Sequence, residues 1–164
     1  MDIYKFVCIF CKNKTLSMKF TKVEEGTICD CFSDASENST DLFVRKVRVS
    51  QSLKDPDFRN HIERKKNPNN EDDCSEVCGL HALSFEIWSE LSSDLLMKKY
   101  QTTVAISPQS KKNLCIVKFK PNSGLVKYTP NQEEYNEFHY DFYKIDDFTV
   151  ANLELVDMIQ ITAS

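Results

Sequence analysis

The stretch from residue 84 to residue 99, SFEIWSELSSDLLMKK, decides the fold of this chain. Its large apolar side chains recur at the three- and four-residue spacing of an amphipathic helix; they are Phe85, Ile87, Trp88, Leu91, Leu95 and Leu96. Ser84 suits the N-cap position, and Lys98 and Lys99 suit the negative end of the helix dipole. The pattern predicts one long amphipathic helix over residues 84–99.

On either side of this helix the pattern changes to the alternation typical of half-buried β-strands. Asp55 and Pro56 mark the start of a second, shorter basic helix over about residues 56–66. The order of β-rich, helical and β-rich segments favours an α+β fold with a mostly antiparallel sheet. Strands are expected at 3–10, 16–23, 27–32, 42–49 (as an edge strand), 102–106, 114–119, 125–128 and 148–161.

Length and composition fit a single globular domain over residues 1–164. Hydrophobic residues make up 41% of the chain and aromatic residues 11%, which argues against disorder. The polar segment 67–73, NPNNEDD, predicts a loop, and we expect it to be the most mobile part of the chain.

The N-terminal segment predicts the compartment. Lys5, Lys12 and Lys14 interrupt the apolar run that a secretory signal would need, and no window is apolar enough to span a membrane. We therefore expect an intracellular, cytoplasmic protein without membrane contact. In a reducing compartment its seven cysteines, an odd number, are expected to be free, buried or metal-bound rather than paired.

The first four cysteines suggest a zinc site. Cys8 and Cys11 have the two-residue spacing of a zinc knuckle, and Cys29 and Cys31 offer a second pair. The residues between Cys8 and Cys11 are apolar rather than turn-forming, so the alternative is that these cysteines are small buried residues.

Cys74, Cys78 and His81 form the densest group. In a helix these spacings place all three on one face, which offers a second zinc set with His61 or a remote cysteine as the fourth ligand. Alternatively, Cys78 is a candidate nucleophile because a helix N-terminus stabilises a thiolate, and His81 and His139 would then be its acid–base partners. A buried cysteine at a loop-to-helix junction is the structural alternative.

The segment around His139 is acidic and aromatic. His139 and Asp141 share one face of a strand, so the carboxylate can orient the imidazole. Tyr135 and Tyr143 flank this pair, and tyrosine is favoured as an interface anchor. These four residues predict a surface that binds a protein partner.

A basic segment offers a third hypothesis. Residues 45–66 contain eight basic and three acidic residues, whereas residues 133–157 contain eight acidic residues and one lysine. The net charge of −4 weakens this hypothesis, because nucleic-acid-binding domains carry a basic excess. The candidate phosphate contacts are Arg45, Arg48, Arg59, Arg64, Lys65 and Lys66.

Three functions follow in order of preference. A protein-binding or regulatory domain comes first, because the sequence contains no phosphate-binding loop and no enzyme signature of fixed spacing. A small Cys/His-dependent hydrolase or nuclease-like toxin comes second, and a nucleic-acid-binding protein third. No organic cofactor is expected, and zinc is the one metal that the residues suggest.

Overall fold

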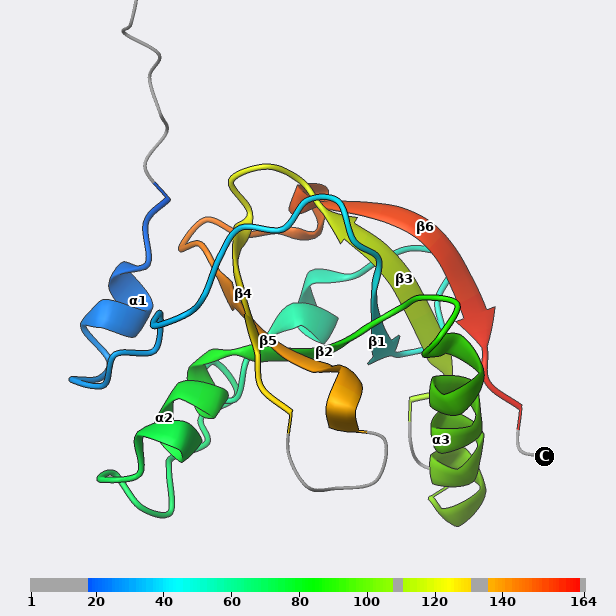
Figure 1. The fold of residues 1–164 in the computed structure, drawn as a ribbon, viewed down its shortest axis with the longest axis horizontal. Coiled ribbons are helices and arrows are strands. Elements are labelled where there is room, and N and C mark those ends of the chain that lie inside the picture. Colours follow the sequence, from blue (N-terminus) through cyan, green and yellow to red (C-terminus); the bar gives the residue numbers. More distant parts are fainter. Residues whose placement is uncertain (1–17, 108–110, 131–135, 163–164) are drawn as a thin grey trace, which may run out of the picture.

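The computed structural model describes residues 18–107, 111–130 and 136–162, which form a six-stranded antiparallel sheet with helices around it (Figure 1). The strands lie in the order β4-β5-β2-β1-β3-β6. This architecture confirms the predicted α+β fold. The strands are β1 (Phe43–Val47), β2 (Leu83–Ile87), β3 (Asn113–Phe119), β4 (Gly124–Tyr128), β5 (His139–Lys144) and β6 (Leu153–Gln160).

Three α-helices accompany the sheet in the described part of the chain, and they differ in length and place. They are α1 (Thr21–Glu24), α2 (Cys74–His81) and α3 (Ser93–Ile106), with single 3-10 turns at Asp55–Phe58, Asn136–Phe138 and Val150–Asn152. In Figure 1, α1 and α2 lie near the β4 side of the sheet and α3 lies near the β6 side. No helix in the described segments is long and apolar enough to cross a membrane.

The sheet is strongly curled. In a flat sheet β3 and β5 would lie about 14 Å apart, because β1 and β2 separate them, yet the rings of Phe119 and Phe142 stack with centroids 4.0 Å apart. The curl also allows residues 120–123 to join β3 directly to β4. The concave side holds the main core, which includes Phe43, Phe58, Phe85, Phe119, Val126, Phe142 and Leu153.

The tight connection from β3 to β4 depends on Gly124. Its φ is 154°, and a Cβ at this position would collide with the carbonyl oxygen of Tyr143 on β5. Only glycine fits this close approach without strain.

The long helix begins at Ser93 rather than at residue 84. Leu83, Phe85 and Ile87 alternate with Ser84 and Glu86, so residues 83–87 form strand β2 and place their apolar side chains in the main core.

A short turn then separates β2 from α3. Within it, the Ser92 hydroxyl donates to the carbonyl oxygen of Ile87 at 2.7 Å and accepts from the backbone N–H of Ser89 at 2.9 Å. Helix α3 packs its buried residues Leu96, Tyr100 and Val104 against the other face of the sheet.

Several other local expectations differ from the structure. The 42–49 strand is central rather than at an edge, since β1 pairs with both β2 and β3. Residues 56–66 form one 3-10 turn and a run of further turns, and residues 102–106 belong to α3. Residues 21–24 are helical and 27–32 form a bend and the start of a turn instead of a strand, while the expected strand at 3–10 lies outside the described residues.

The loop over residues 67–73 is held by Glu76 of α2. The Glu76 carboxylate accepts hydrogen bonds from the backbone N–H groups of Asn69 at 2.8 Å and Asn70 at 3.1 Å. Asp73 caps α2 by accepting from the N–H groups of Ser75 and Glu76. These contacts define where the helix begins.

Candidate functional site

Two disulfides join the segment after α1 to helix α2. Cys29 is bonded to Cys74, and Cys31 is bonded to Cys78. Disulfides form and persist in oxidising environments such as the extracellular space. The expectation of an intracellular, cytoplasmic protein with unpaired cysteines is therefore wrong, and the pairing points to an oxidising, extracellular or secreted setting.

The two disulfides also determine whether the predicted zinc ligands and the predicted nucleophile are available as thiols. A cysteine binds zinc or acts as a nucleophile only as a thiolate. In this structure the four cysteines Cys29, Cys31, Cys74 and Cys78 are instead joined in two disulfide pairs. Neither expected zinc set is intact in this form, and Cys78 carries no free thiol for a nucleophilic attack. Cys8 and Cys11 lie outside the described residues.

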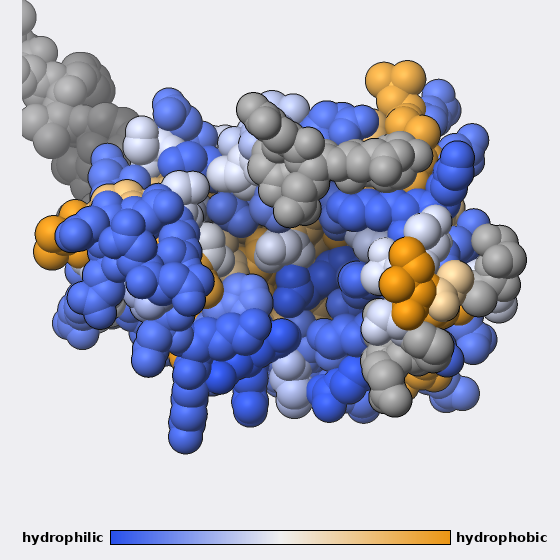
Figure 2. Space-filling model, turned by 90° about the horizontal axis from the view of Figure 1, so that it is seen from below, coloured by the Kyte–Doolittle hydropathy of each residue, from blue (hydrophilic) through white to orange (hydrophobic). Residues whose placement is uncertain are grey.

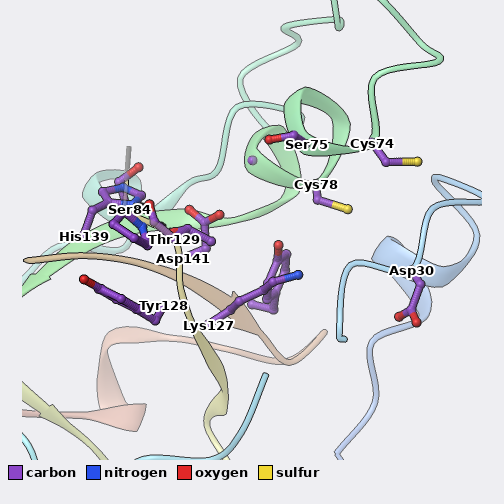
Figure 3. Close-up of a pocket in the computed structure, with 13 residues that line it drawn as sticks. Asp30, Cys74, Ser75, Cys78, Ser84, Lys127, Tyr128, Thr129, His139 and Asp141 are labelled. Carbon is purple, nitrogen blue, oxygen red and sulfur yellow. Dashed lines mark hydrogen bonds between the residues drawn. The ribbon is translucent and has the colours of Figure 1, made fainter. Parts of the chain in front are cut away.

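A cavity of about 600 Å³ opens between α2 and strands β4 and β5 (Figure 3). We refer to it as the α2 groove. Figure 2 shows the underside of the molecule as a largely hydrophilic face, hollowed between the α2 and α3 sides. The residues that line the groove are Asp30, Cys74, Ser75, Cys78, Gly79, Ser84, Lys127, Tyr128, Thr129, Pro130, His139, Asp141 and Tyr143.

The floor of the groove is a row of three polar side chains on neighbouring strands. Asp141 of β5 lies directly opposite Lys127 of β4 on one side and Ser84 of β2 on the other. Residues that pair directly across antiparallel strands project from the same face. The sheet register therefore places a carboxylate between an amine and a hydroxyl, facing α2.

His139 lies next to this row and is held by Thr129. Its Nδ1 is 2.9 Å from Thr129 Oγ1 and 3.0 Å from the Thr129 carbonyl oxygen. These contacts fix the orientation of the imidazole ring. Figure 3 shows His139, Thr129 and Asp141 together, with α2 across the groove.

Asp141 is only 8% exposed, and its burial raises the pKa of the carboxyl group above the usual value. Electrostatic interactions with His139 and Lys127 and a hydrogen bond from Thr129 lower the pKa of Asp141 but do not outweigh burial. A buried carboxyl group whose charged form is only partly compensated is typical of functional sites.

The structure places the other predicted binding and acid–base residues differently. Tyr143 is 1% exposed and belongs to the core between α1, α2 and the sheet, so it is not a surface anchor. Tyr135 lies outside the described residues. His81 is also buried, where burial lowers the pKa of its imidazole, and it faces Gly26 in cavities other than the α2 groove.

Strand β4 supplies groove residues that the sequence reasoning missed. Lys127 and Tyr128 belong to the strand predicted over 125–128 and Thr129 directly follows it, but the sequence pattern indicates no functional role for any of the three. Tyr128 is 53% exposed, and its ring centroid lies 5.1 Å from that of Tyr140. The signal that would have found them is pairing between 124–128 and the aromatic segment 139–144, which places Tyr128 opposite Tyr140.

The six candidate phosphate contacts divide into two groups. Arg45 donates to the carbonyl oxygens of Asp57 and Ser84, and Arg48 pairs with the Asp57 carboxylate at 3.1 Å. These two arginines have internal partners that compete with phosphate. The remaining four are exposed on the turns after β1, and they are Arg59, Arg64, Lys65 and Lys66.

A second polar cavity of about 240 Å³ lies beside the α2 groove and shares Ser84 with it. Arg45, Lys46, Lys111, Glu86 and Tyr100 complete its lining. The Glu86 carboxylate accepts from Tyr100 Oη and pairs with Lys99 at 2.9 Å. Glu86 also lies opposite His139 in the sheet register, so the two cavities adjoin along one face.

No known protein family, no curated protein and no solved structure matches this chain. The geometry of the α2 groove is therefore the basis on which a function can be inferred.

Proposed function

We propose that this protein is a non-catalytic binding module that recognises a protein partner through the α2 groove. The observation that carries the proposal is the polar row Lys127–Asp141–Ser84, which faces a helix fixed in place by two disulfides. A rigid wall and pre-positioned polar groups reduce the entropy lost when a ligand binds.

The rim of the groove supports a protein or peptide partner. The exposed Tyr128 supplies an aromatic anchor beside polar groups, and its hydroxyl donates to the Glu137 carbonyl oxygen at 2.8 Å. Interfaces typically combine tyrosine anchors with a polar rim. This arrangement keeps His139 and Asp141 of the predicted acidic aromatic surface and replaces the buried Tyr143 by Tyr128 as the aromatic anchor.

The charges in the groove favour a basic side chain of the partner. Asp141 lies in the floor and Asp30 at the wall, while Lys127 is the one lysine or arginine that lines the groove among the described residues. An incoming lysine or arginine would supply a second positive charge to Asp141, whose ionised form is only partly compensated. Charge-assisted hydrogen bonds of this kind are the stronger class.

A peptide-display library tests this proposal with the oxidised, full-length protein as bait. We expect the selected peptides to be rich in lysine and arginine, and their affinity to fall at least tenfold on Asp141→Asn and on Tyr128→Ala. Glu154→Gln changes an exposed acid on β6, at the other end of the sheet, and serves as the matched control. Selected peptides that bind all three variants as well as the wild type would contradict the proposal, as would the absence of any enrichment.

A small hydrolase is the second candidate, because His139 and the carboxyl group of Asp141 share one groove. A carboxyl group with a raised pKa beside an imidazole is the arrangement used for acid–base chemistry. Turnover of a chromogenic phosphodiester or ester that is lost in both His139→Ala and Asp141→Asn would favour this candidate over binding alone. Equal background rates for wild type and variants would remove it.

A further inference from the structure

The four disulfide-bonded cysteines form one compact cluster. Cys74 and Cys78 lie four residues apart on α2, which places their side chains on the same face, about 5–6 Å apart. Cys29 and Cys31 lie in a tight turn in which the Cys31 N–H donates to the Cys29 carbonyl oxygen at 3.0 Å. Figure 3 shows the sulfurs of Cys74 and Cys78 both directed toward the segment that carries Asp30.

The backbone positions suit a tetrahedral metal site. The Cα–Cα distances are 5.5 Å for Cys29 and Cys74, and 5.2 Å for Cys31 and Cys78. Four sulfurs at about 2.3 Å from a zinc ion lie roughly 3.8 Å from one another. Because the two segments already face each other across both disulfides, we expect side-chain rotation in the reduced form to bring the four sulfurs to that spacing.

We propose that, when both disulfides are reduced, Cys29, Cys31, Cys74 and Cys78 together bind one Zn²⁺ ion. The two zinc sets expected from the sequence each contained two of these four cysteines: Cys29 and Cys31 in one, Cys74 and Cys78 in the other. The proposed site combines these two pairs into a single set of ligands. The proposal is independent of what binds in the α2 groove.

The chemistry balances with a phosphine reductant as the electron donor. Each disulfide takes two electrons and two protons and gives two thiols, while each of two phosphine molecules is oxidised to its phosphine oxide with oxygen from water. Binding of Zn²⁺ to the four thiols then releases up to four protons. The zinc ion replaces two covalent links between the same two segments.

The surroundings divide the cluster into an inner and an outer half. Cys31 is 1% exposed and Cys78 is 8% exposed, and both pack with Phe20, Val23 and Tyr143. Cys74 is exposed and Cys29 is partly buried. The outer half gives a reductant and an incoming ion a route to the cluster, and the apolar inner half shields the bound ion from water.

The test starts from the full-length protein reduced with a phosphine under anaerobic conditions. Zinc uptake is measured by competition with a chromogenic chelator, and Co²⁺ serves as a spectroscopic probe of the ligand set. We expect one zinc ion per chain, the intense ligand-field bands of a tetrahedral cobalt thiolate, and recovery of the native circular dichroism if reduction has disturbed the fold.

Matched variants identify the ligands. Cys29→Ser and Cys74→Ser should each weaken zinc binding at least tenfold, whereas the pair Cys8→Ser with Cys11→Ser should bind as the wild type does. Cys115→Ala is a second control, since Cys115 is a buried thiol on β3. Loss of binding in the Cys8/Cys11 variant, an octahedral cobalt spectrum, or no uptake at micromolar zinc would overturn the proposal.

Discussion

Arg45 of β1 donates a hydrogen bond from Nη1 to the carbonyl oxygen of Ser84 in β2 at 2.6 Å. The two strands pair only at Phe43–Ile87 and Val44–Glu86, and beyond these pairs they diverge. The guanidinium group of Arg45 spans the gap between the two strands, and its Nε donates to the Asp57 carbonyl oxygen at 3.2 Å. A side chain therefore takes over the hydrogen bonds that a longer strand pairing would have made.

Replacing Arg45 by alanine should lower the free energy of unfolding by about 2–3 kcal/mol, because the partly buried Asp57 carbonyl oxygen and the exposed Ser84 carbonyl oxygen both lose a charged donor. Arg59→Ala is the control, since Arg59 is exposed, and it should change stability by no more than about 0.5 kcal/mol. Urea denaturation at pH 7 measures both values. Equal effects of the two substitutions would show that the bridge contributes nothing.

Asp57 should make the stability of the protein depend on pH in the acid range. The carboxylate is 2% exposed and pairs with Arg48 and Lys111, each at 3.1 Å. Burial raises the pKa of Asp57, but the hydrogen bond and charge of Lys111, followed by those of Arg48, outweigh burial and hold the pKa below its usual value. A lowered folded-state pKa contributes stability above the unfolded-state value of about 3.9, and this contribution is lost as the pH falls through the folded-state pKa.

Asp57→Asn tests this dependence. At pH 7 the variant should be about 1.5–3 kcal/mol less stable than the wild type, because hydrogen bonds to a charged acceptor are lost, and the difference should shrink toward pH 2. Asp147→Asn removes an exposed carboxylate and should follow the wild-type profile. A difference for Asp57→Asn that stays constant from pH 7 to pH 2 would exclude the charge as its cause.

Asp141→Asn should raise the stability of the protein at pH 7, whereas Asp57→Asn lowers it. Burial raises the pKa of Asp141, so its contribution to stability is greatest below the unfolded-state pKa and is lost as the pH rises through the folded-state value. The asparagine variant should therefore be more stable than the wild type at pH 7, by roughly 1 kcal/mol, and not at pH 3. Thermal unfolding at the two pH values measures this. A variant that is less stable at pH 7 would mean that hydrogen bonds to the carboxylate outweigh burial.

The two disulfides should be coupled in their effect on stability. They connect residues 45 and 47 positions apart, so they close nearly the same loop. By chain entropy the first to close contributes about 4 kcal/mol, and the second, which closes a remaining loop of about eight residues, contributes about 2.5 kcal/mol.

Serine substitution of one pair should therefore cost about 2.5 kcal/mol, whichever pair is removed, and substitution of both pairs about 6.5 kcal/mol. Urea denaturation of the three variants in oxidised form gives the comparison. If removing both disulfides lowered the free energy of unfolding by no more than the sum of the two single removals, the shared-loop interpretation would be contradicted.

The fold class could be predicted from the sequence because apolar and polar residues alternate in most of the strands. Residues 114–119 and 125–128 were predicted as strands, and they match β3 and β4 closely. The helix predicted over 84–99 is wrong in its first half, because the positions of Phe85 and Ile87 are compatible with the two-residue period of a strand as well as with a helical period. Tertiary pairing with β1 and β5 selects the strand there, and no local signal decides between the two.

The site was harder to predict because it depends on contacts between distant segments. His139 and Asp141 were identified from their spacing, but Lys127 and Ser84 became their neighbours only through the sheet register. The cysteine pairing likewise joins residues more than forty positions apart. Connectivity of this kind cannot be deduced from cysteine spacing alone.

The order of strands in the sheet has a consequence for how quickly the chain reaches its native state. Among the five strand pairings, β1 with β3 and β2 with β5 join segments more than fifty residues apart in sequence. Such pairings require large loops to close before any contact is gained, so we expect the chain to fold more slowly than a helical bundle of the same length. Formation of Cys31–Cys78 early in folding would shorten the chain path between β1 and β3, so refolding should be faster from the oxidised chain than from the reduced one.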